Sequence, residues 1–506
     1  MNLRLAINGK LSNICCMNEE FASYLNASGE VGYVRRVVSS LLYVEGLPSV
    51  RPFELVMYEN GAFGYVNSFS EEEVETIGFS ETPLTSGMRV ARTNKLLTVP
   101  VGEELLGAMI NPLGQYLRKD STKDTPKIQR AVDVEPLPIR ARARVSQPCL
   151  TGITIADIMV PLGKGQRALI VGDQKTGKTS FLLRTLTTQI RQGAIGIYVT
   201  VGKSKLVIKQ IEEYLKEQGV FDRTVVVAAY AENPAGIIFL APYTGMTIAE
   251  YFRDAGTDVI IVIDDLSMHA KMHRELALLG RRTPGRNSYP GDMFFLHARL
   301  MERAGNFLTP HGEKSITCLP VIETPQGDIT GYIATNSISM TDGHIFFDYN
   351  LFVSGQRPAI NPFLSVTRVG RQIQPPLTKE INQLLTTFLS SARKLETITS
   401  FGAELNEQIK ETLVKQQQIY VFFNQLAHEI LTPYLQVYLF GLVWNNTWKE
   451  TALDTVNGIL RAMVARYSSD TTFQKQVDAL VKASDSLDSL LQKTREYHLL
   501  STTPKA

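Results

Sequence analysis

The spacing of apolar and polar positions changes twice along the chain. From Gly29 to about Val99, short apolar runs such as residues 53–58 are separated by turn residues, and the segment is rich in Val, Tyr, Ser and Gly. Short runs of β-branched and aromatic residues between turns are typical of strands in a small all-β domain. This segment is therefore expected to form a β-barrel.

A second pattern follows the proline-bearing connection of residues 124–148. Apolar runs alternate with amphipathic stretches, and this alternation predicts a parallel sheet with helices on both faces. The runs are residues 168–171, 195–201, 224–228 and 258–263. After Pro375 and Pro376, apolar residues recur at i, i+3, i+4 spacing, which predicts a helical last third.

A phosphate-binding loop is indicated at residues 171–180, which read VGDQKTGKTS. The stretch fits the pattern G-x-x-x-x-G-K-[ST], whose glycines let backbone N–H groups turn toward phosphate oxygens. The lysine reaches the outer phosphates, and the threonine offers its hydroxyl to Mg²⁺. An apolar run precedes the loop and a helical pattern follows it, so the phosphates would sit at a helix N-terminus. The candidate nucleotide-binding residues are Gly172, Asp173, Gln174, Lys175, Thr176, Gly177, Lys178 and Thr179.

Two carboxylates, Asp264 and Asp265, end the last apolar run. In a P-loop fold this position lies at the carboxyl edge of the sheet beside Thr179, where Asp264 can hold a Mg²⁺-bound water. A solvated pair of aspartates is the alternative. The phosphate-binding loop upstream favours a magnesium site made of Thr179 and Asp264.

Hydrolysis needs one further group, which orients or activates the attacking water and is usually a carboxylate or a glutamine. The expected place is the end of the strand that begins at Ile195, and there the chain reads Gly202-Lys203. A lysine is charged at neutral pH, so it can bind phosphate oxygens but is poorly suited to accept a proton from water. The site is therefore expected to hold a nucleotide rather than cleave it. The alternative is that Lys203 is an ordinary surface lysine at the start of the next helix.

Net charge, cysteine content and the longest apolar stretches indicate which partners and which compartment the chain fits. The 506 residues include 52 Lys and Arg against 50 Asp and Glu, and this net charge of +2 gives no overall attraction to nucleic acid or to an anionic membrane. The four cysteines form no C-x-x-C pair and fit a reduced compartment. The N-terminal stretch has no continuous apolar region, so a secretory signal is not expected. Polar residues interrupt the most apolar stretch, 419–444, which is expected to form buried helices.

One pair of histidines has a spacing that metal ligands on a helix can have. His269 and His273 lie four residues apart and could share a helix face. No glutamate accompanies them in an H-E-x-x-H arrangement, so a metal role is not expected.

Six stretches carry a resemblance to a known family. They read GDQKTGKT (172–179), AEYFRDAG (249–256), IDDLS (263–267), RRTPGRNSYPGDMFFLHARLMERA (281–304), TNSISMTDGHIFF (335–347) and RPAINPFLSVTRVG (357–370). With them the chain resembles the α subunits of F-type rotary ATP synthases over essentially its full length. The resemblance implies an α/β multidomain fold with an N-terminal β-barrel, a central RecA-like P-loop α/β domain and a C-terminal α-helical domain. The corresponding segments are 29–99, 100–370 and 371–506, preceded by an N-terminal segment, 1–28.

The resemblance also implies a division of labour. In that family three α and three β subunits alternate in a hexamer around the γ central stalk, and the interconversion of ADP, phosphate and ATP takes place on β. The strand after the phosphate-binding loop ends in Gly-Glu in β and in Gly-Gln in α, so Gly202-Lys203 sides with the non-catalytic subunit. This chain would thus be a non-catalytic, nucleotide-binding subunit of a two-sector, ion-transporting ATPase, with ATP or ADP and Mg²⁺ as cofactors.

Further site residues and partners follow from the resemblance alone. Arg368 matches the arginine that α extends into the neighbouring β site, and Ser365 matches a position linked to activity, so both would act in trans. Gln416 and Gln418 match the glutamines that approach the adenine. The implied partners are β, γ and possibly the peripheral-stalk subunits δ and b, with no nucleic acid. The implied location is the cytoplasmic, or equivalent inner, face of an energy-transducing membrane such as a bacterial inner membrane, reached only through the Fo sector.

The chain departs from the family pattern at four places, one of which is Thr367, where the family signature ends in Ser. Residues 173–176 read DQKT where the family has D-R-Q-T, and residues 419–421 read IYV where the family has Tyr-x-Pro. Residues 1–28 lack the clear amphipathic helix that docks δ, because Asn8-Gly9 and Cys15-Cys16 interrupt the pattern.

Two other functions use the same core. A self-sufficient hexameric RecA-like ATPase of the export-motor type needs a carboxylate at position 203, where this chain has lysine. A nucleic-acid translocase needs a basic channel lined by aromatic residues, which neither the charge balance nor the N-terminal composition indicates.

Overall fold

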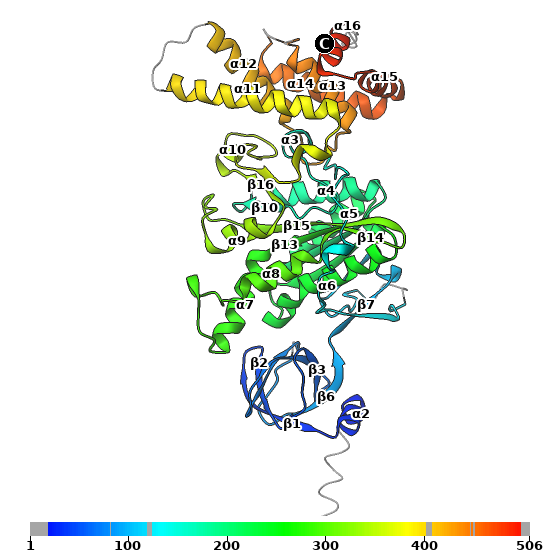
Figure 1. Cartoon of the computed structure of the whole chain (residues 1–506), viewed down its shortest axis with the longest axis vertical. Coiled ribbons are helices and arrows are strands. Elements are labelled where there is room, and N and C mark those ends of the chain that lie inside the picture. Colours follow the sequence, from blue (N-terminus) through cyan, green and yellow to red (C-terminus); the bar gives the residue numbers. More distant parts are fainter. Residues whose placement is uncertain are drawn as a thin grey trace, which may run out of the picture. The chain divides into compact units, whose positions relative to one another are not determined.

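The structure is a computed structural model of the chain, and it describes residues 19–80, 82–118, 124–400, 407–445, 447–448 and 451–496. The chain forms two compact units. The first comprises Met1–Arg140 and Ile197–Arg303, and the second comprises Ala141–Gly196 and Ala304–Ala506. The N-terminal barrel, drawn in blue in Figure 1, belongs to the first unit, and the C-terminal helices, drawn from yellow to red, belong to the second.

Six strands close the N-terminal barrel, as the alternation of short apolar runs predicts. The order around the barrel is β1-β2-β5-β4-β3-β6. Its interior is aliphatic, and Leu42, Val56 and Val66 are fully buried there. The strands are β1 (Val31–Val38), β2 (Leu41–Glu45), β3 (Glu54–Tyr58), β4 (Phe63–Phe69), β5 (Val74–Gly78) and β6 (Arg89–Leu96). The short helix α2 (Glu19–Ser28) precedes them and buries Phe21 against Met57 and Ala91. Residues 1–18, the rest of the segment considered for δ docking, lie outside the described residues.

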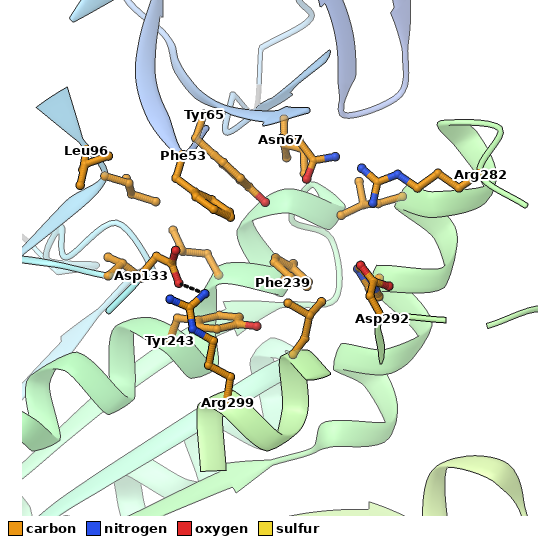
Figure 2. A pocket seen from close by; sticks show the side chains of 17 residues that line it. Phe53, Tyr65, Asn67, Leu96, Asp133, Phe239, Tyr243, Arg282, Asp292 and Arg299 are labelled. Carbon is orange, nitrogen blue, oxygen red and sulfur yellow. Dashed lines mark hydrogen bonds and ion pairs between the residues drawn. The ribbon is translucent and has the colours of Figure 1, made fainter. Parts of the chain in front are cut away.

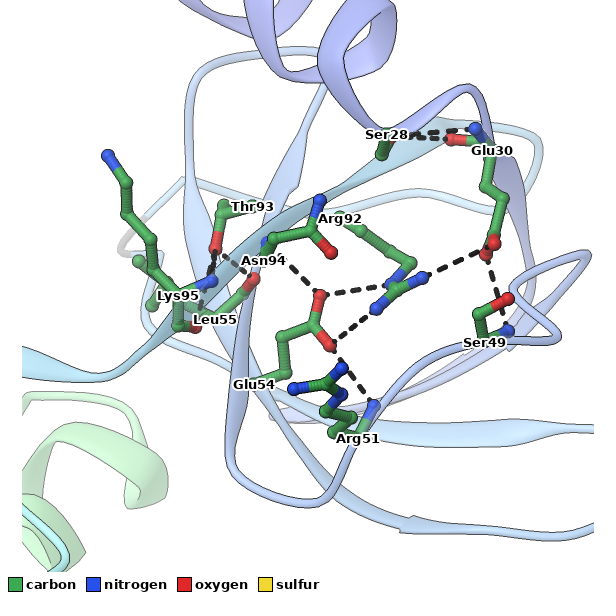
Figure 3. Close-up of polar contacts among 10 residues, drawn as sticks. All are labelled: Ser28, Glu30, Ser49, Arg51, Glu54, Leu55, Arg92, Thr93, Asn94 and Lys95. Atoms are coloured by element: carbon green, nitrogen blue, oxygen red, sulfur yellow. Dashed lines mark hydrogen bonds and ion pairs between the residues drawn. The ribbon is translucent and has the colours of Figure 1, made fainter.

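A buried arginine joins β3 to β6 (Figure 3). Arg92 Nε and Nη2 donate to the two carboxylate oxygens of Glu54, each at 3.0 Å. Arg92 Nη1 reaches Glu30 at 3.3 Å. Glu54 also accepts from the backbone N–H groups of Arg51 and Asn94, at 3.1 and 3.2 Å. Both charges are therefore paired and hydrogen-bonded, which is the condition under which a buried ion pair is tolerated.

The first unit also contains one part of the central α/β domain. Its strands follow the order β13-β11-β12-β8, and β8 and β12 are parallel. All six residues of β13 are buried, as expected for a fully apolar strand of a parallel sheet. The strands are β8 (Ala108–Ile110), β11 (Ile195–Lys203), β12 (Thr224–Tyr230) and β13 (Val259–Asp264), and the helices are α5 (Lys205–Glu217), α6 (Ala235–Asp254), α7 (Leu266–Leu279) and α8 (Met293–Glu302). A separate antiparallel pair is formed by β7 (Thr98–Val101) and β9 (Ile128–Ala131).

The second unit contains the other part of the α/β domain. Strand β10 (Leu169–Gly172) pairs in parallel with β15 (Gly312–Glu323) on one side and with β16 (Gly343–Phe347) on the other. Two antiparallel strands, which the pattern of apolar runs does not predict, adjoin this group: β14 (Gly305–Thr309) pairs with β15, and β17 (Val366–Thr367) pairs with β16. The helices are α3 (Thr154–Met159), α4 (Lys178–Arg191), α9 (Tyr332–Met340) and α10 (Tyr349–Val353).

The last third is helical, as predicted. Its helices are α11 (Pro376–Ser400), α12 (Glu407–Phe423), α13 (Pro433–Trp444), α14 (Leu453–Ser469), α15 (Thr471–Lys482) and α16 (Leu487–Glu496). Most of α13 is buried, which accounts for the apolar stretch that ends at Trp444. Among the described residues, no helix combines the length and the apolar character needed to cross a membrane. The expected α/β multidomain fold, with a barrel, a central nucleotide-binding domain and a helical domain, is confirmed.

Candidate functional site

The phosphate-binding loop connects the end of β10 to the start of α4. Gly172 ends the strand, and a Cβ atom placed on it would lie only 2.4 Å from the carbonyl oxygen of Phe347, the residue paired with it on β16. Gly177 precedes α4 with φ near 96°, in the left-handed region that glycine adopts without strain. Gly172 is thus required because a side chain there would clash with β16, and Gly177 because its backbone is left-handed. Their effect is to turn the loop onto the N-terminus of a 14-residue helix.

Lys178 lies over this loop. Its Nζ donates to the carbonyl oxygens of Gly172 and Asp173, at 2.9 and 2.5 Å, and its side chain is buried. Thr176 Oγ1 donates to the carbonyl of Asp173 at 2.7 Å and fixes the turn from inside. Thr179, in the first turn of α4, is exposed. Lys178 and Thr179 supply the cation and the hydroxyl expected of a phosphate site, and both lie at the N-terminal end of α4.

Asp173 and Gln174 are engaged by the segment that follows β15. The Oδ1 atom of Asp173 accepts from Thr324 Oγ1 at 2.9 Å and from the Gly327 N–H at 2.6 Å, and Gln174 Nε2 donates to Glu323 at 2.8 Å. These two side chains therefore anchor the loop to its neighbour. Contact with phosphate would fall to the backbone N–H groups, to Lys178 and to Thr179.

In the first unit, the acidic end of β13 pairs with Lys203. The Lys203 ammonium lies 2.9 Å from Asp264 Oδ1 and 2.9 Å from Asp265 Oδ2. Tyr198 donates its hydroxyl to Asp264 Oδ2 at 3.1 Å, and the Met268 N–H donates to Asp265 Oδ1 at 2.6 Å, which caps helix α7. Each of the four carboxylate oxygens thus has a donor from this chain. Burial disfavours the charged ammonium, but the two carboxylates outweigh it and raise the pKa of Lys203 above its ordinary value.

This arrangement corrects one sequence interpretation of Lys203. The side chain is only 20% exposed and is held by two carboxylates, so it is not an ordinary surface lysine. It also bears on the predicted magnesium site. Mg²⁺ requires oxygen ligands in octahedral geometry, and the oxygens of Asp264 already accept from an ammonium and a phenol. Each of these oxygens keeps a second lone pair that can accept from a Mg²⁺-bound water. Thr179 belongs to the other unit, so its pairing with Asp264 stays a prediction.

A cavity of about 660 Å³ in the second unit is lined by the segment that follows β16 and by helices α11 and α12. Its rim includes Asp348, which directly follows Phe347, the partner of Gly172 on β16. From helix α12 and the residue that follows it, the cavity is lined by Gln417, Tyr420, Val421 and Asn424, which share one face at i, i+3, i+4, i+7 spacing. The cavity is the right size for a nucleoside.

The two glutamines predicted to approach adenine do not line this cavity. Both are buried: Gln416 Nε2 donates to Glu396 at 3.2 Å, and Gln418 Nε2 donates to the carbonyl of Trp448 at 2.8 Å. Helix α12 runs on to Phe423, so both glutamines lie inside the helix rather than at its end. The segment that follows the helix is the one tied to the loop region, since Ser180 Oγ, next to Thr179, donates to the carbonyl of Ala427 at 3.4 Å.

Arg368 and Ser365 flank the short strand β17. Arg368 is exposed and lines a hollow of about 270 Å³ together with Arg142, Arg144 and Arg167. Its guanidinium makes no side-chain hydrogen bond to the described residues. Ser365 Oγ donates to the carbonyl of Asn361 at 2.7 Å and accepts from the Phe346 N–H at 2.9 Å. The arginine is therefore available to an outside group, whereas the serine hydroxyl holds the loop that positions β17.

A second cavity, of about 240 Å³, lies in the first unit and had no signal in the sequence (Figure 2). Phe53 and Tyr65 of the barrel domain face Phe239 and Tyr243 of α6 across it. The charged groups at its edge are already paired, as Arg299 with Asp133 at 3.0 Å, Arg282 with Glu75 at 3.0 Å and His273 with Asp292 at 2.9 Å. The cavity is thus an apolar space edged by paired charges, and Arg299 Nε and the Tyr243 hydroxyl are buried there without a hydrogen-bond partner among the described residues.

The histidines near α7 have structural partners. His269 is fully buried and shares a 2.9 Å hydrogen bond with His297, and its ring stacks on Phe239. No group of three or more His, Cys, Asp or Glu among the described residues could hold a metal ion.

Known proteins show similarity over most of the chain. Residues 152–367 match the model of the ATP synthase alpha/beta family, nucleotide-binding domain. An ATP synthase subunit alpha from Lactobacillus delbrueckii subsp. bulgaricus is 39% identical over 428 residues, which cover 84% of this chain and 85% of the relative. One from Staphylococcus aureus is 42% identical over 390 residues, which cover 77% of each chain. The similarity therefore extends well beyond the nucleotide-binding domain.

Proposed function

The chain belongs to the family of ATP synthase α subunits, and we propose that it binds an adenine nucleotide without hydrolysing it. One observation carries the proposal: at the end of β11, where a hydrolysing site needs a proton acceptor or a water-orienting group, this chain has an ammonium held by two carboxylates. Lys203 cannot take a proton from water while it is itself protonated.

The proposed nucleotide lies with its phosphates at the N-terminus of α4. Lys178 would exchange its contacts with the loop carbonyls for contacts with the outer phosphates, and the backbone N–H groups of residues 173–177 would bind their oxygens. The nucleoside would enter the cavity lined by Tyr420 and Asn424. Gln416 and Gln418 would then support α12 from within.

The proposed assembly is an α₃β₃ hexamer around a γ subunit, with δ and b as possible peripheral partners. Arg368 would reach the phosphates bound on the neighbouring β subunit. It is exposed, and a planar guanidinium with several fixed donors suits the charge of a transferring phosphoryl group. Ser365 would act indirectly, by positioning the strand that carries Arg368. The complex would couple ion flow to ATP synthesis or hydrolysis at the inner face of an energy-transducing membrane, and this chain would meet the membrane only through other subunits.

A binding experiment on the full-length chain tests the proposal. Fluorescence of trinitrophenyl-ATP would be titrated with the wild-type chain, with Lys178→Ala and with Lys209→Ala, and ATP turnover would be assayed on the same preparations. Lys209 is a matched control because it lies on an exposed helix face. We expect Lys178→Ala to weaken binding by at least about tenfold, the control to bind like the wild type, and none of the isolated chains to hydrolyse ATP.

Two outcomes would overturn the proposal. Failure of the wild-type chain to bind nucleotide would remove the site. Turnover by the isolated chain that Lys178→Ala abolishes would favour a self-sufficient ATPase instead.

A further inference from the structure

The hollow that contains Arg368 is lined by more positive than negative charge. Four arginines and one acid are among the described residues that line it, and all of them belong to the second unit. Arg167 takes up the acid, because it donates to both carboxylate oxygens of Asp342, at 2.9 and 2.7 Å. Burial works against the charge of Asp342, but Arg167 and, to a smaller extent, Arg368 hold its pKa below the ordinary value. The lining therefore keeps a positive charge that Asp342 does not balance.

Arg144 is brought to this hollow by the extended backbone that precedes it. Arg142 forms an antiparallel bridge with Phe307 of β14, and the Ala143 N–H donates to the carbonyl of Asn306 at 2.8 Å. Side chains alternate along an extended backbone, so Arg142 and Arg144 point to the same side. The Asn306 side chain also donates to the Arg144 carbonyl at 3.0 Å. The place of Arg144 is thus fixed by its contacts with β14.

Arg368 is held in the same hollow by a separate set of contacts. Its N–H donates to the carbonyl of Asp342 at 2.9 Å, directly after the pairing of β17 with β16. Gln372 follows Arg368 by four residues, and its side-chain oxygen accepts a hydrogen bond from Arg144 Nη2. The segment that carries Arg368 therefore also holds the guanidinium of Arg144.

The two arginines are suited to bind one anion together. Both are exposed, and neither makes an ion pair with an acid among the described residues. Like charges in one hollow repel each other, and an anion between them removes that cost. A guanidinium offers a planar fork of donors that matches the oxygens of a phosphate group. The hollow, at about 270 Å³, exceeds the roughly 30 Å³ of a water molecule several-fold and has room for such a group.

We propose that Arg144 is a second phosphate ligand beside Arg368, so that both guanidiniums contact the phosphoryl group of a nucleotide bound on the neighbouring β subunit. The inference rests on the proposed function, since it requires Arg368 to reach that nucleotide. Arg144 exchanges no proton and forms no covalent bond. It adds donors to the phosphate oxygens, both while the phosphoryl group is transferred and when inorganic phosphate is bound alone.

The experiment uses the full-length chain co-expressed with a β subunit. It measures kcat for ATP hydrolysis by the hexamer and the concentration of inorganic phosphate that halves the rate. For Arg144→Gln we expect kcat to fall, and the half-inhibiting phosphate concentration to rise, by about tenfold each, as expected for loss of a charged hydrogen bond. Arg461→Gln is the matched control, because Arg461 is exposed on α14, and it should behave like the wild type.

Two further variants separate contact with phosphate from a structural role. Arg144→Lys keeps the charge without the fork of donors, so it should lose less than Arg144→Gln; it also serves as the test if Arg144→Gln does not assemble, which size-exclusion chromatography would show. If Arg144 and Arg368 act on the same phosphate, Arg144→Gln should cost less when added to Arg368→Lys than when added to the wild type.

The outcomes separate this inference from the proposed function. An assembled Arg144→Gln hexamer that matches the control in kcat and in phosphate inhibition would overturn the inference, and so would losses that simply add to those of Arg368→Lys. In both cases the proposed function stands, because Arg368→Lys still loses turnover. Unchanged turnover in Arg368→Lys would overturn the role proposed for Arg368 and this inference with it.

Discussion

His269 and His297 share a hydrogen bond in the interior of the first unit, with 2.9 Å between Nδ1 of the first ring and Nε2 of the second. One ring donates in this bond and the other accepts. Burial lowers the pKa of His297 to about 3 and that of His269 well below its ordinary value. The second nitrogen of His269 faces the carbonyl of Phe239 at 3.1 Å.

This pair predicts a loss of stability in mild acid. Above the ordinary histidine pKa of about 6.5, neither the folded nor the unfolded chain protonates these rings, and their contribution is complete. As the pH falls, the unfolded chain binds protons that the folded chain excludes until the pH nears the lowered pKa. Between pH 7 and 5 the free energy of unfolding should drop by about 2 kcal/mol for each ring. Urea unfolding at the two pH values checks this, and His297→Gln should show a smaller drop than the wild type. An equal drop in both would contradict the assignment.

The buried pair of Arg303 and Glu250 predicts a large effect of breaking it. Arg303 donates to both Glu250 oxygens, at 3.0 and 2.7 Å, and also to the carbonyl of Val132 and the hydroxyl of Thr247. Arg303→Met should cost about 3–5 kcal/mol, because it leaves the carboxylate of Glu250 buried and unpaired. Arg303→Met/Glu250→Gln should recover part of this loss. Urea denaturation of both variants measures it, and a double variant no more stable than the single one would count against a charge effect.

Arg368 predicts an effect that appears only in the assembled complex. The chain would be co-expressed with a β subunit, and ATP turnover of the hexamer would be compared for wild type, Arg368→Lys and the exposed control Arg461→Lys. Lysine keeps the charge but loses the planar fork of donors, so Arg368→Lys should lose most turnover, on the order of 10³-fold. Size-exclusion chromatography would verify assembly. Unchanged turnover in an intact hexamer would remove Arg368 from the reaction.

The nucleoside cavity predicts which residues of α12 affect ATP affinity. Tyr420 lines the cavity, whereas Gln418 is buried and donates to the carbonyl of Trp448. Tyr420→Ala should weaken ATP binding by about 0.5–1.5 kcal/mol through lost aromatic contact, and Gln418→Ala should leave it unchanged. Equilibrium dialysis on both variants decides between the two faces of the helix. The opposite ranking would restore the glutamines to the adenine.

Features encoded within a few adjacent residues could be predicted from the sequence. The phosphate-binding loop is one, because its glycines meet requirements of the immediate backbone at Gly172 and Gly177. The barrel is another, since its short apolar runs are bounded by turn residues within the same stretch of chain.

Features that depend on neighbouring strands could not be predicted. The partners of Lys203 lie 61 and 62 residues away, at the last residue of β13 and the one after it, and nothing local to either strand states that β11 and β13 are adjacent in the sheet. The surroundings of the α12 glutamines could not be predicted for a similar reason: a motif in the sequence shows neither how far a helix continues nor which face it turns inward.

The closed barrel described above has a consequence for how such chains meet one another. Strand β1 pairs with β2 on one side and with β6 on the other, so the described strands return on themselves and present no open row of backbone N–H and C=O groups. A neighbouring protein cannot dock there by extending the sheet. A partner that binds the barrel must therefore contact its side chains. A single substitution can then change which partner binds without altering the strands of the barrel.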